Sequence, residues 1–346
     1  MGSPEVEPMG DGAVVTEADI STAELDAPRP QTRAGARALS VLSAPLNLQI
    51  LRALSQRPMR LAELRKATGL PAQTTLRGHL SNLVELGALQ KRPTRQMPYA
   101  VENELTSLGE GLLDVADRLE TWLQAAPDAP IPLESAAAKG AIKALVDGWE
   151  SKMMRALAAR PLSLTQLDRL ISDFSYPALE RRLASMRLAG LVEGQRGQGG
   201  GTPYSVTDWA RLGVAPLAAA SHCERVHMSE DSASVTQIDI EAAFLLATPL
   251  VGLKPDVAGF CQLEVEASPG VVLRPAGVQV TVEHGRVVAC VSRLQPSPAV
   301  YAVGTAVNWF HAIKDGKVKE LRFGGSLAED VVGGLYSAFS KAPVAT

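Results

Sequence analysis

Two short stretches of polar and basic side chains carry groups that could bind a nucleic acid. Each stretch falls in the first half of a predicted helix, where outward-facing side chains can reach base edges in a major groove. Arginine can pair bidentately with guanine and glutamine with adenine, so these residue types at a helix start predict base contacts. The candidates in the first stretch are Gln73, Thr74, Thr75, Arg77 and His79. The candidates in the second stretch are Ser175, Tyr176, Arg181 and Arg182.

A basic loop follows each of these helices and supplies a second kind of contact. Lys91, Arg92 and Arg95 lie in the first loop, and Arg196 lies in the second. We expect these side chains to bind phosphates or to enter the minor groove. The alternative for any one of them is a solvated surface residue, which is the ordinary place for an arginine or a lysine. The hypothesis therefore rests on the whole set, and His79 fits a helix surface better than a base reader.

The elements that would position these residues are short helices followed by a hairpin. In residues 73–86, four leucines at spacings of four, three and three predict a helix with one buried face. Shorter helices over 61–67 and 164–170 precede the two candidate helices, and Gly87 and Gly190 close them. Helix, helix, turn, helix and hairpin is the winged helix-turn-helix plan, in which the third helix enters the major groove.

The whole pattern occurs twice in the chain, 103 residues apart. Residues 52–89 and 155–192 share ten identities over 38 ungapped positions, among them Arg-Ala-Leu, Arg-Pro and a closing glycine. Beyond this stretch the pair Pro98-Tyr99 matches Pro203-Tyr204, which predicts a loop two residues longer in the second copy. We interpret the two copies as tandem winged helices that arose by duplication.

Three segments of the second copy form a recognisable set. They are residues 171–183, Gly-Leu-Val-Glu at 190–193 and Tyr-Ser-Val-Thr at 204–207. With these segments the second copy resembles the HxlR-type winged-helix regulators, which usually have a leucine in place of Val206. The first copy is similar to more general ArsR- or MarR-like wings. Both resemblances imply binding to double-stranded DNA and give no indication of the operator.

Changes in composition divide the chain. The predicted parts are a tail at 1–35, winged helices at 36–126 and 133–228, and a third domain at 235–342. The tail holds seven acidic and two basic residues and should be disordered. Two tandem winged helices can act as one covalent pseudo-dimer or can meet a second chain in a homodimer. An apolar stripe over residues 105–123 fits either packing within the chain or a subunit interface.

The third domain is mixed rather than helical. Alternating apolar runs predict strands at 262–266, 278–283 and 287–291, with a tight turn at 283–286. Helices are expected at 238–253 and 327–339. We therefore expect a fold that is mainly α with small β wings, followed by a small α+β domain with one antiparallel sheet and its helices on one side.

The end of this domain, residues 302–339, carries a further resemblance. In three segments this end is similar to sterol-carrier-protein-2-like domains. They are a segment from Trp309 to Gly316, a strand at 321–323 and Gly-Gly-Ser-Leu-Ala before the last helix. The resemblance implies an apolar cavity between sheet and helices for a small hydrophobic ligand, lipid-like or polyketide-like. The candidate lining residues are Phe244, Phe260, Trp309, Phe310 and Tyr336. Each of them could instead be an ordinary core aromatic.

Several function classes are excluded by what the sequence lacks. No run of about 18 apolar residues occurs, so no membrane partner is expected. The three scattered cysteines fit a reducing cytoplasm. No nucleophile elbow, zinc-protease helix or Cys-x-x-Cys occurs, so we expect no enzyme and no cofactor. His222, Cys223, Glu224 and His227 are close in sequence, but their spacing on a helix is awkward for a metal, and none is expected.

The distribution of charge completes the functional hypothesis. The whole chain has a net charge of −3, but residues 36–228 hold 23 basic and 18 acidic residues. Because DNA affinity depends on the local field, this suits a DNA-binding region. The leading hypothesis is a regulator of antibiotic resistance or biosynthesis that binds DNA and senses a hydrophobic ligand. The alternative is a self-resistance protein that sequesters a hydrophobic natural product.

Overall fold

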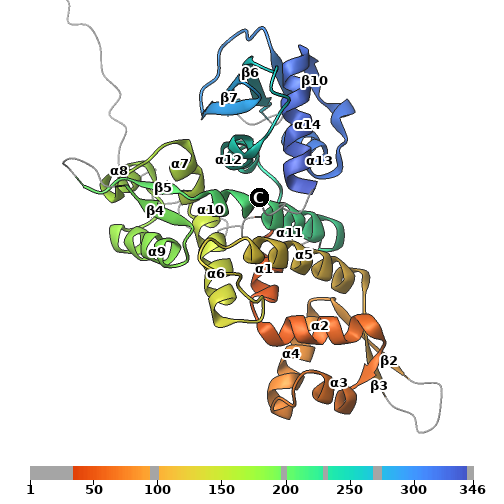
Figure 1. The fold of residues 1–346 in the computed structure, drawn as a ribbon. Helices are drawn as coiled ribbons and strands as arrows, with labels where there is room; N and C mark the ends of the chain where they lie inside the picture. Colours follow the sequence, from red (N-terminus) through yellow and green to blue (C-terminus); the bar gives the residue numbers. More distant parts are fainter. Residues whose placement is uncertain (1–33, 94–100, 196–200, 229–232, 268–274, 341–346) are drawn as a thin grey trace, which may run out of the picture. The chain divides into compact units, whose positions relative to one another are not determined.

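The first run of elements consists of five helices and a small three-stranded sheet. The computed structural model describes residues 34–93, 101–195, 201–228, 233–267 and 275–340, so the predicted tail lies almost wholly outside them. Strands in this run are antiparallel in the order β1-β3-β2, and Leu89 pairs with Leu105. The run consists of α1 (Ala36–Leu42), α2 (Pro45–Gln56), β1 (Met59–Arg60), α3 (Leu61–Ala67), α4 (Gln73–Glu85), β2 (Leu89–Pro93), β3 (Val101–Leu105) and α5 (Ser107–Gln124) (Figure 1).

A second run repeats this order of elements. Strands β4 and β5 form an antiparallel hairpin, and an isolated bridge between Leu162 and Tyr204 takes the place of the β1–β3 pairing. Two consecutive helices follow this hairpin where α5 follows the first one. The run consists of α6 (Ala136–Glu150), α7 (Met153–Ala159), α8 (Leu164–Leu170), α9 (Tyr176–Leu188), β4 (Val192–Gly194), β5 (Tyr204–Val206), α10 (Asp208–Leu212) and α11 (Val214–His227).

Equivalent glycines close the last helix before the hairpin in each run. Gly87 and Gly190 have φ of 86° and 75°, a left-handed conformation that costs a residue with a Cβ atom about 1–2 kcal/mol. The next amide then donates back into the helix, from Ala88 to the carbonyl of Leu83 and from Leu191 to that of Met186, each at 2.9 Å. This stop turns the chain directly into the hairpin.

The structure corrects the predicted alignment of the two hairpin loops. Thr106 and Thr207 occupy the same place after their hairpins, because each hydroxyl accepts from the third amide of the next helix. Each hydroxyl also donates to the carbonyl of the closing glycine, at 2.7 Å for Gly87 and 2.9 Å for Gly190. These threonines are 101 residues apart, against 103 for the glycines. The second loop is therefore two residues shorter, not two longer, and the Pro-Tyr match was a coincidence of sequence.

The C-terminal run forms a five-stranded sheet in the order β10-β9-β6-β7-β8. The predicted turn at 283–286 is confirmed, since His284 and Gly285 both have positive φ between β7 and β8. The expectation of a purely antiparallel sheet is wrong, because β6 and β9 are parallel. The run consists of α12 (Gln237–Ala247), β6 (Gly259–Val265), β7 (Ala276–Glu283), β8 (Arg286–Val291), β9 (Tyr301–Gly304), α13 (Ala306–Asp315), β10 (Arg322–Gly324) and α14 (Ser326–Ser340).

One helix boundary and one strand in this run differ from the sequence prediction. The helix expected over 238–253 ends at Ala247, and a short 3-10 turn follows at Thr248–Leu250, where Pro249 cannot continue an α-helix. Strand β9 was not predicted, because Tyr301–Gly304 is too short for its alternation to stand out. This missed strand is the one that pairs parallel to β6, which explains the error in sheet type.

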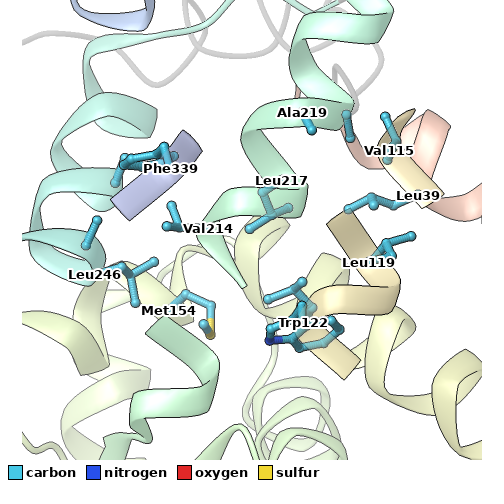
Figure 2. Packing of buried hydrophobic residues seen from close by; sticks show 14 of the residues in the cluster. Leu39, Val115, Leu119, Trp122, Met154, Val214, Leu217, Ala219, Leu246 and Phe339 are labelled. Atoms are coloured by element: carbon cyan, nitrogen blue, oxygen red, sulfur yellow. The ribbon is translucent and has the colours of Figure 1, made fainter. Parts of the chain in front are cut away.

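One continuous core joins the three runs of elements. Buried side chains extend from α1 and α5 through α11 to α12 and α14, and Figure 2 shows Leu39, Leu119, Leu217, Leu246 and Phe339 among them. The stripe over 105–123 lies on α5, which packs against α11 and α2. Packing within the chain therefore accounts for this stripe. Among the described residues, no helix combines the length and the apolar character needed to cross a membrane.

Candidate nucleic-acid interface

Helix α4 is held by its leucine face and exposes its polar face. Leu76, Leu80 and Leu83 are buried, and the helix packs on α2. Gly69 and Leu70 both have positive φ in the turn that leads into α4, and Pro71 follows. The Nε of Arg65 donates to the carbonyl of Pro71 at 2.9 Å and so spans the turn. These contacts fix the direction in which α4 leaves α3.

The outward side chains of α4 include four of the five predicted base contacts. Gln73, Thr74, Thr75 and Arg77 are exposed. None of them has a hydrogen bond or ion pair with another residue in the described part of the chain. The fifth candidate differs, because Nδ1 of His79 lies 2.7 Å from Oδ1 of Asn47 in α2. His79 therefore links two helices.

The first hairpin, whose strand β2 contacts α4, carries exposed cations. Lys91 and Arg92 are exposed on β2, and Arg92 lies 3.4 Å from Glu104 on the paired strand β3. That pair is exposed and weak, at about 0–1 kcal/mol, so the guanidinium can exchange its partner for a phosphate. Arg95 lies outside the described residues. Exposed polar groups on α4 and cations on β2 together form the arrangement that a groove-binding helix and its wing require.

The comparison with family models falls on this part of the chain. Residues 41–129 match the HxlR-like helix-turn-helix family. This segment runs from the end of α1 through the hairpin and α5, so it contains every exposed group described above. The HxlR-like helix-turn-helix family is a family of DNA-binding transcription regulators, so the match indicates DNA-binding transcription regulation. A comparison with curated proteins gave no match.

The HxlR-like match lies on the first copy, whereas the HxlR-type resemblance expected from sequence concerned the second copy. For the first copy, this match corrects the expected likeness to ArsR- or MarR-like wings. The short identities in residues 171–207 drew attention to the second copy. They are local, while the family comparison spans the helices and hairpin of the first copy.

The second set of candidates is arranged differently. Ser175 precedes α9, Tyr176 opens it with 44% of its surface exposed, and Arg181 is exposed one turn later. Arg182 is half-buried, and its guanidinium carbon lies 4.2 Å from the centre of the Phe174 ring. This cation–π contact holds the guanidinium of Arg182 against Phe174 of the second run rather than toward a DNA partner. Arg196 lies outside the described residues.

Charge separates the two candidate faces. Residues 61–93 of the first copy hold five basic and two acidic side chains, whereas residues 164–195 of the second hold four of each. Glu180 is exposed beside Arg181 on α9, while the first half of α4 has no acidic residue. Since phosphate attraction follows local charge, the first face should have the greater affinity for DNA.

The histidine and cysteine cluster on α11 has other roles. Glu224 is buried and accepts from the amides of Gly35 and Ala38, each at 2.8 Å, at the start of α1. His222 stacks on Phe310 with ring centres 6.3 Å apart. Burial and, to a smaller extent, the nearby Glu224 raise the pKa of the Cys223 thiol to about 12. No three potential ligands converge on a metal position within the described residues.

The predicted ligand-lining aromatics do not share one cavity in the described structure. Phe244 and Trp309 are fully buried and meet edge to face with ring centres 4.6 Å apart. Phe260 is half-buried on β6, and Tyr336 is 37% exposed, packed over Gly316. Of these five aromatics, Phe310 lines an apolar pocket whose other walls include residues of α11. No sequence pattern indicated the α11 side of that pocket, because the residues of α11 read as part of the second copy.

Proposed function

We propose that the chain is a DNA-binding transcriptional regulator in which residues 36–126 supply the main contact with DNA. The observation that carries this proposal is the exposed, unpartnered polar face of α4 within the segment that matches an HxlR-like helix-turn-helix. Arg77 and Gln73 suit base edges, and Lys91 suits a phosphate. His79 is left out of the proposed contacts because it bonds Asn47.

The second run, residues 133–228, is proposed as a second winged helix that makes the chain a covalent pseudo-dimer. Its repeated order of elements supports this, as does the packing of α5 against α11, the helices that follow the two hairpins. Its neutral face contributes less to affinity than the first face. The operator should therefore be asymmetric, with one strongly bound half-site.

Residues 235–342 are proposed as a ligand-sensing domain that acts on the winged helices. Helix α12 packs on α7 of the second run and contacts α11, so a change at the C-terminal domain has a direct route to the winged helices. A small hydrophobic ligand suits the apolar pocket beside Phe310. The competing proposal is a ligand-sequestering protein without operator affinity. Its support is that the candidate face on α9 has no net positive charge.

The proposal is tested by binding to the DNA upstream of the protein's own coding sequence across a salt series. Specific binding should weaken steeply with salt, because phosphate contacts release counterions. Arg77→Ala should weaken binding by about 1–3 kcal/mol and relax specificity at one position. Lys91→Ala should reduce the slope of log affinity against log salt by about one, with a similar loss on all sequences.

Matched variants distinguish a DNA face from a general loss of charge. Arg286→Ala removes an exposed arginine from β8 in the C-terminal run and should leave affinity unchanged. Arg181→Ala should have a smaller effect than Arg77→Ala because the α9 face is neutral. Absence of a specific complex at any salt concentration, with small-molecule binding retained, would favour sequestration. Equal effects of all three arginine variants would also contradict the proposed face.

A further inference from the structure

An apolar pocket lies where α11 meets the C-terminal helices. Its walls are Val214 and Leu217 of α11, Ile240 of α12, Phe310 and Ile313 of α13 and Phe339 of α14. Figure 2 shows Val214 and Leu217 on α11 with Phe339 across from them. The pocket has an empty volume of about 460 Å³, including its open mouth. Most of its lining side chains are apolar, so this slot suits a slender apolar chain.

The polar groups of the pocket are satisfied except for one cation. Ser221 donates its hydroxyl to the carbonyl of Leu217 at 2.8 Å. Asp239 accepts from the amide and the hydroxyl of Thr236, at 2.9 and 2.7 Å, and so caps α12. Lys314 is half-buried on α13 and has no hydrogen bond or ion pair with any residue that the structure describes. An ammonium beside an apolar slot favours a ligand with an anionic head.

Two basic side chains lie against the ring of Phe310, which lines the pocket. The guanidinium of Arg225 lies 4.9 Å from the centre of the Phe310 ring, and His222 stacks on the same ring. Burial lowers the pKa of His222, and Lys314 lowers it further. Lys314 and Arg225 both lower this pKa while Asp315 raises it, so an anion at Lys314 would meet two cations and one carboxylate. A neutral ligand would gain nothing from these two cations.

We propose that this pocket binds a slender amphipathic carboxylate, with its apolar chain between α11 and α13 and its carboxylate at Lys314. This deepens the proposed function, on whose ligand-sensing role it rests, by giving the ligand a chemical class and a place. The site differs from the cavity between sheet and helices that the sequence led us to expect. It lies instead between the C-terminal run and a helix of the second winged-helix run.

The position of α11 explains how the ligand would reach the DNA-binding face. Helix α11 lines the pocket and also packs against α5 and α1. Its Glu224 binds the amides of Gly35 and Ala38 at the start of α1. A chain held between α11 and α13 contacts both helices, so we expect binding to shift α11 relative to α13. Such a shift changes the packing beneath the first winged helix.

The test is calorimetric titration of the full chain with decanoate and with decanol, its uncharged match. Decanoate should bind with one site per chain and decanol more weakly. Lys314→Met should raise the dissociation constant for decanoate about tenfold and leave that for decanol unchanged. Ala218→Leu, which fills the slot from α11, should weaken both. Lys317→Met removes an exposed lysine nearby and should change neither.

The outcomes separate this site from the proposed function as a whole. Thermal unfolding of each variant verifies that it folds, and DNA affinity is measured with and without decanoate. Decanoate binding that is insensitive to both Lys314→Met and Ala218→Leu, or no binding of either compound, would overturn the pocket. Decanoate binding with the expected pattern but without operator affinity would keep the pocket and refute regulation of DNA binding. Operator affinity that decanoate leaves unchanged would overturn the coupling through α11.

Discussion

Trp122 and Trp209 form a reciprocal pair, although 87 residues separate them in sequence. Their rings are stacked with centres 4.6 Å apart and planes 7° from parallel. The indole Nε1 of Trp122 donates to the carbonyl of Trp209 at 2.9 Å, and that of Trp209 donates to the carbonyl of Trp122 at 2.8 Å. Both side chains are buried. The end of α5 is thereby tied to α10, and the two proposed winged helices to each other.

Replacing either tryptophan of this pair by phenylalanine tests the contribution of the indole hydrogen bonds. Trp122→Phe keeps an aromatic ring but leaves the carbonyl of Trp209 without its donor in a buried position. We expect a loss of about 1–3 kcal/mol in the free energy of unfolding, and a similar loss for Trp209→Phe. The double variant should lose less than the sum, since the two bonds share one geometry. Urea unfolding measures all three, and single losses near zero would contradict this account.

Leu70 offers a test of backbone strain in the turn before α4. Its φ is 59° and its side chain is 61% exposed, so it has a left-handed conformation with little burial in return. Leu70→Gly should raise the free energy of unfolding by about 1 kcal/mol. Gly69→Ala is the matched control, because Gly69 also has positive φ and a Cβ there would meet nothing within 4 Å. Gly69→Ala should lower the free energy of unfolding, whereas Leu70→Gly should raise it. Equal changes in the free energy of unfolding for the two variants would argue against backbone strain at Leu70.

The sequence was informative where contacts are local and periodic. Leu76, Leu80 and Leu83 predicted the buried face of α4, and Gly87 predicted its end, since both signals lie within a few residues of what they determine. The exposed positions of Gln73 and Arg77 followed from the same periodicity. Local pattern therefore sufficed for the helices and for most of the first candidate face.

The sequence failed where distant segments meet. Nothing near Glu224 indicates that it caps α1, 186 residues away, and nothing near Trp122 indicates Trp209. The parallel pairing of β6 with β9 depends on a strand of four residues. The pocket at α11 combines residues from both halves of the chain, so no local sequence pattern could predict it.

His222 should make stability depend on pH. Burial against Phe310 lowers its pKa below the ordinary value of 6.5, with smaller contributions from Lys314, Arg225 and His227 and an opposing one from Asp315. The folded chain then binds this proton more weakly than the unfolded chain, so its contribution to stability is lost as pH falls through about 6.5. His222→Gln should reduce the drop in melting temperature between about pH 7.5 and pH 5.5.

A second histidine provides the control for that measurement. His284 lies exposed in the turn between β7 and β8, and asparagine tolerates its positive φ. His284→Asn should leave the pH dependence as it is in the parent chain. An unchanged drop in His222→Gln would show that other groups cause it.

Arg52 and Arg155 occupy equivalent positions in the two copies and should differ in their effect on stability. Arg52 contacts Glu120 and Glu134, all about one-third exposed or more. Arg155 instead pairs with Glu241 of α12, which is 3% exposed and otherwise accepts from Ser292. Arg155→Met leaves that buried carboxylate without its cation and should cost about 3–5 kcal/mol.

The same substitution at the first copy is the matched control. Arg52→Met removes two exposed ion pairs, one with Glu120 and one with Glu134. It should lower the free energy of unfolding by about 1 kcal/mol or less. Denaturant unfolding measures both variants, and Arg155→Met with Glu241→Gln should recover part of the loss because the uncompensated charge is gone. Equal costs at the two positions would mean that Glu241 reaches solvent. A large difference would mean that Arg155 of the second copy stabilises the packing of the C-terminal run, whereas Arg52 acts as a surface residue.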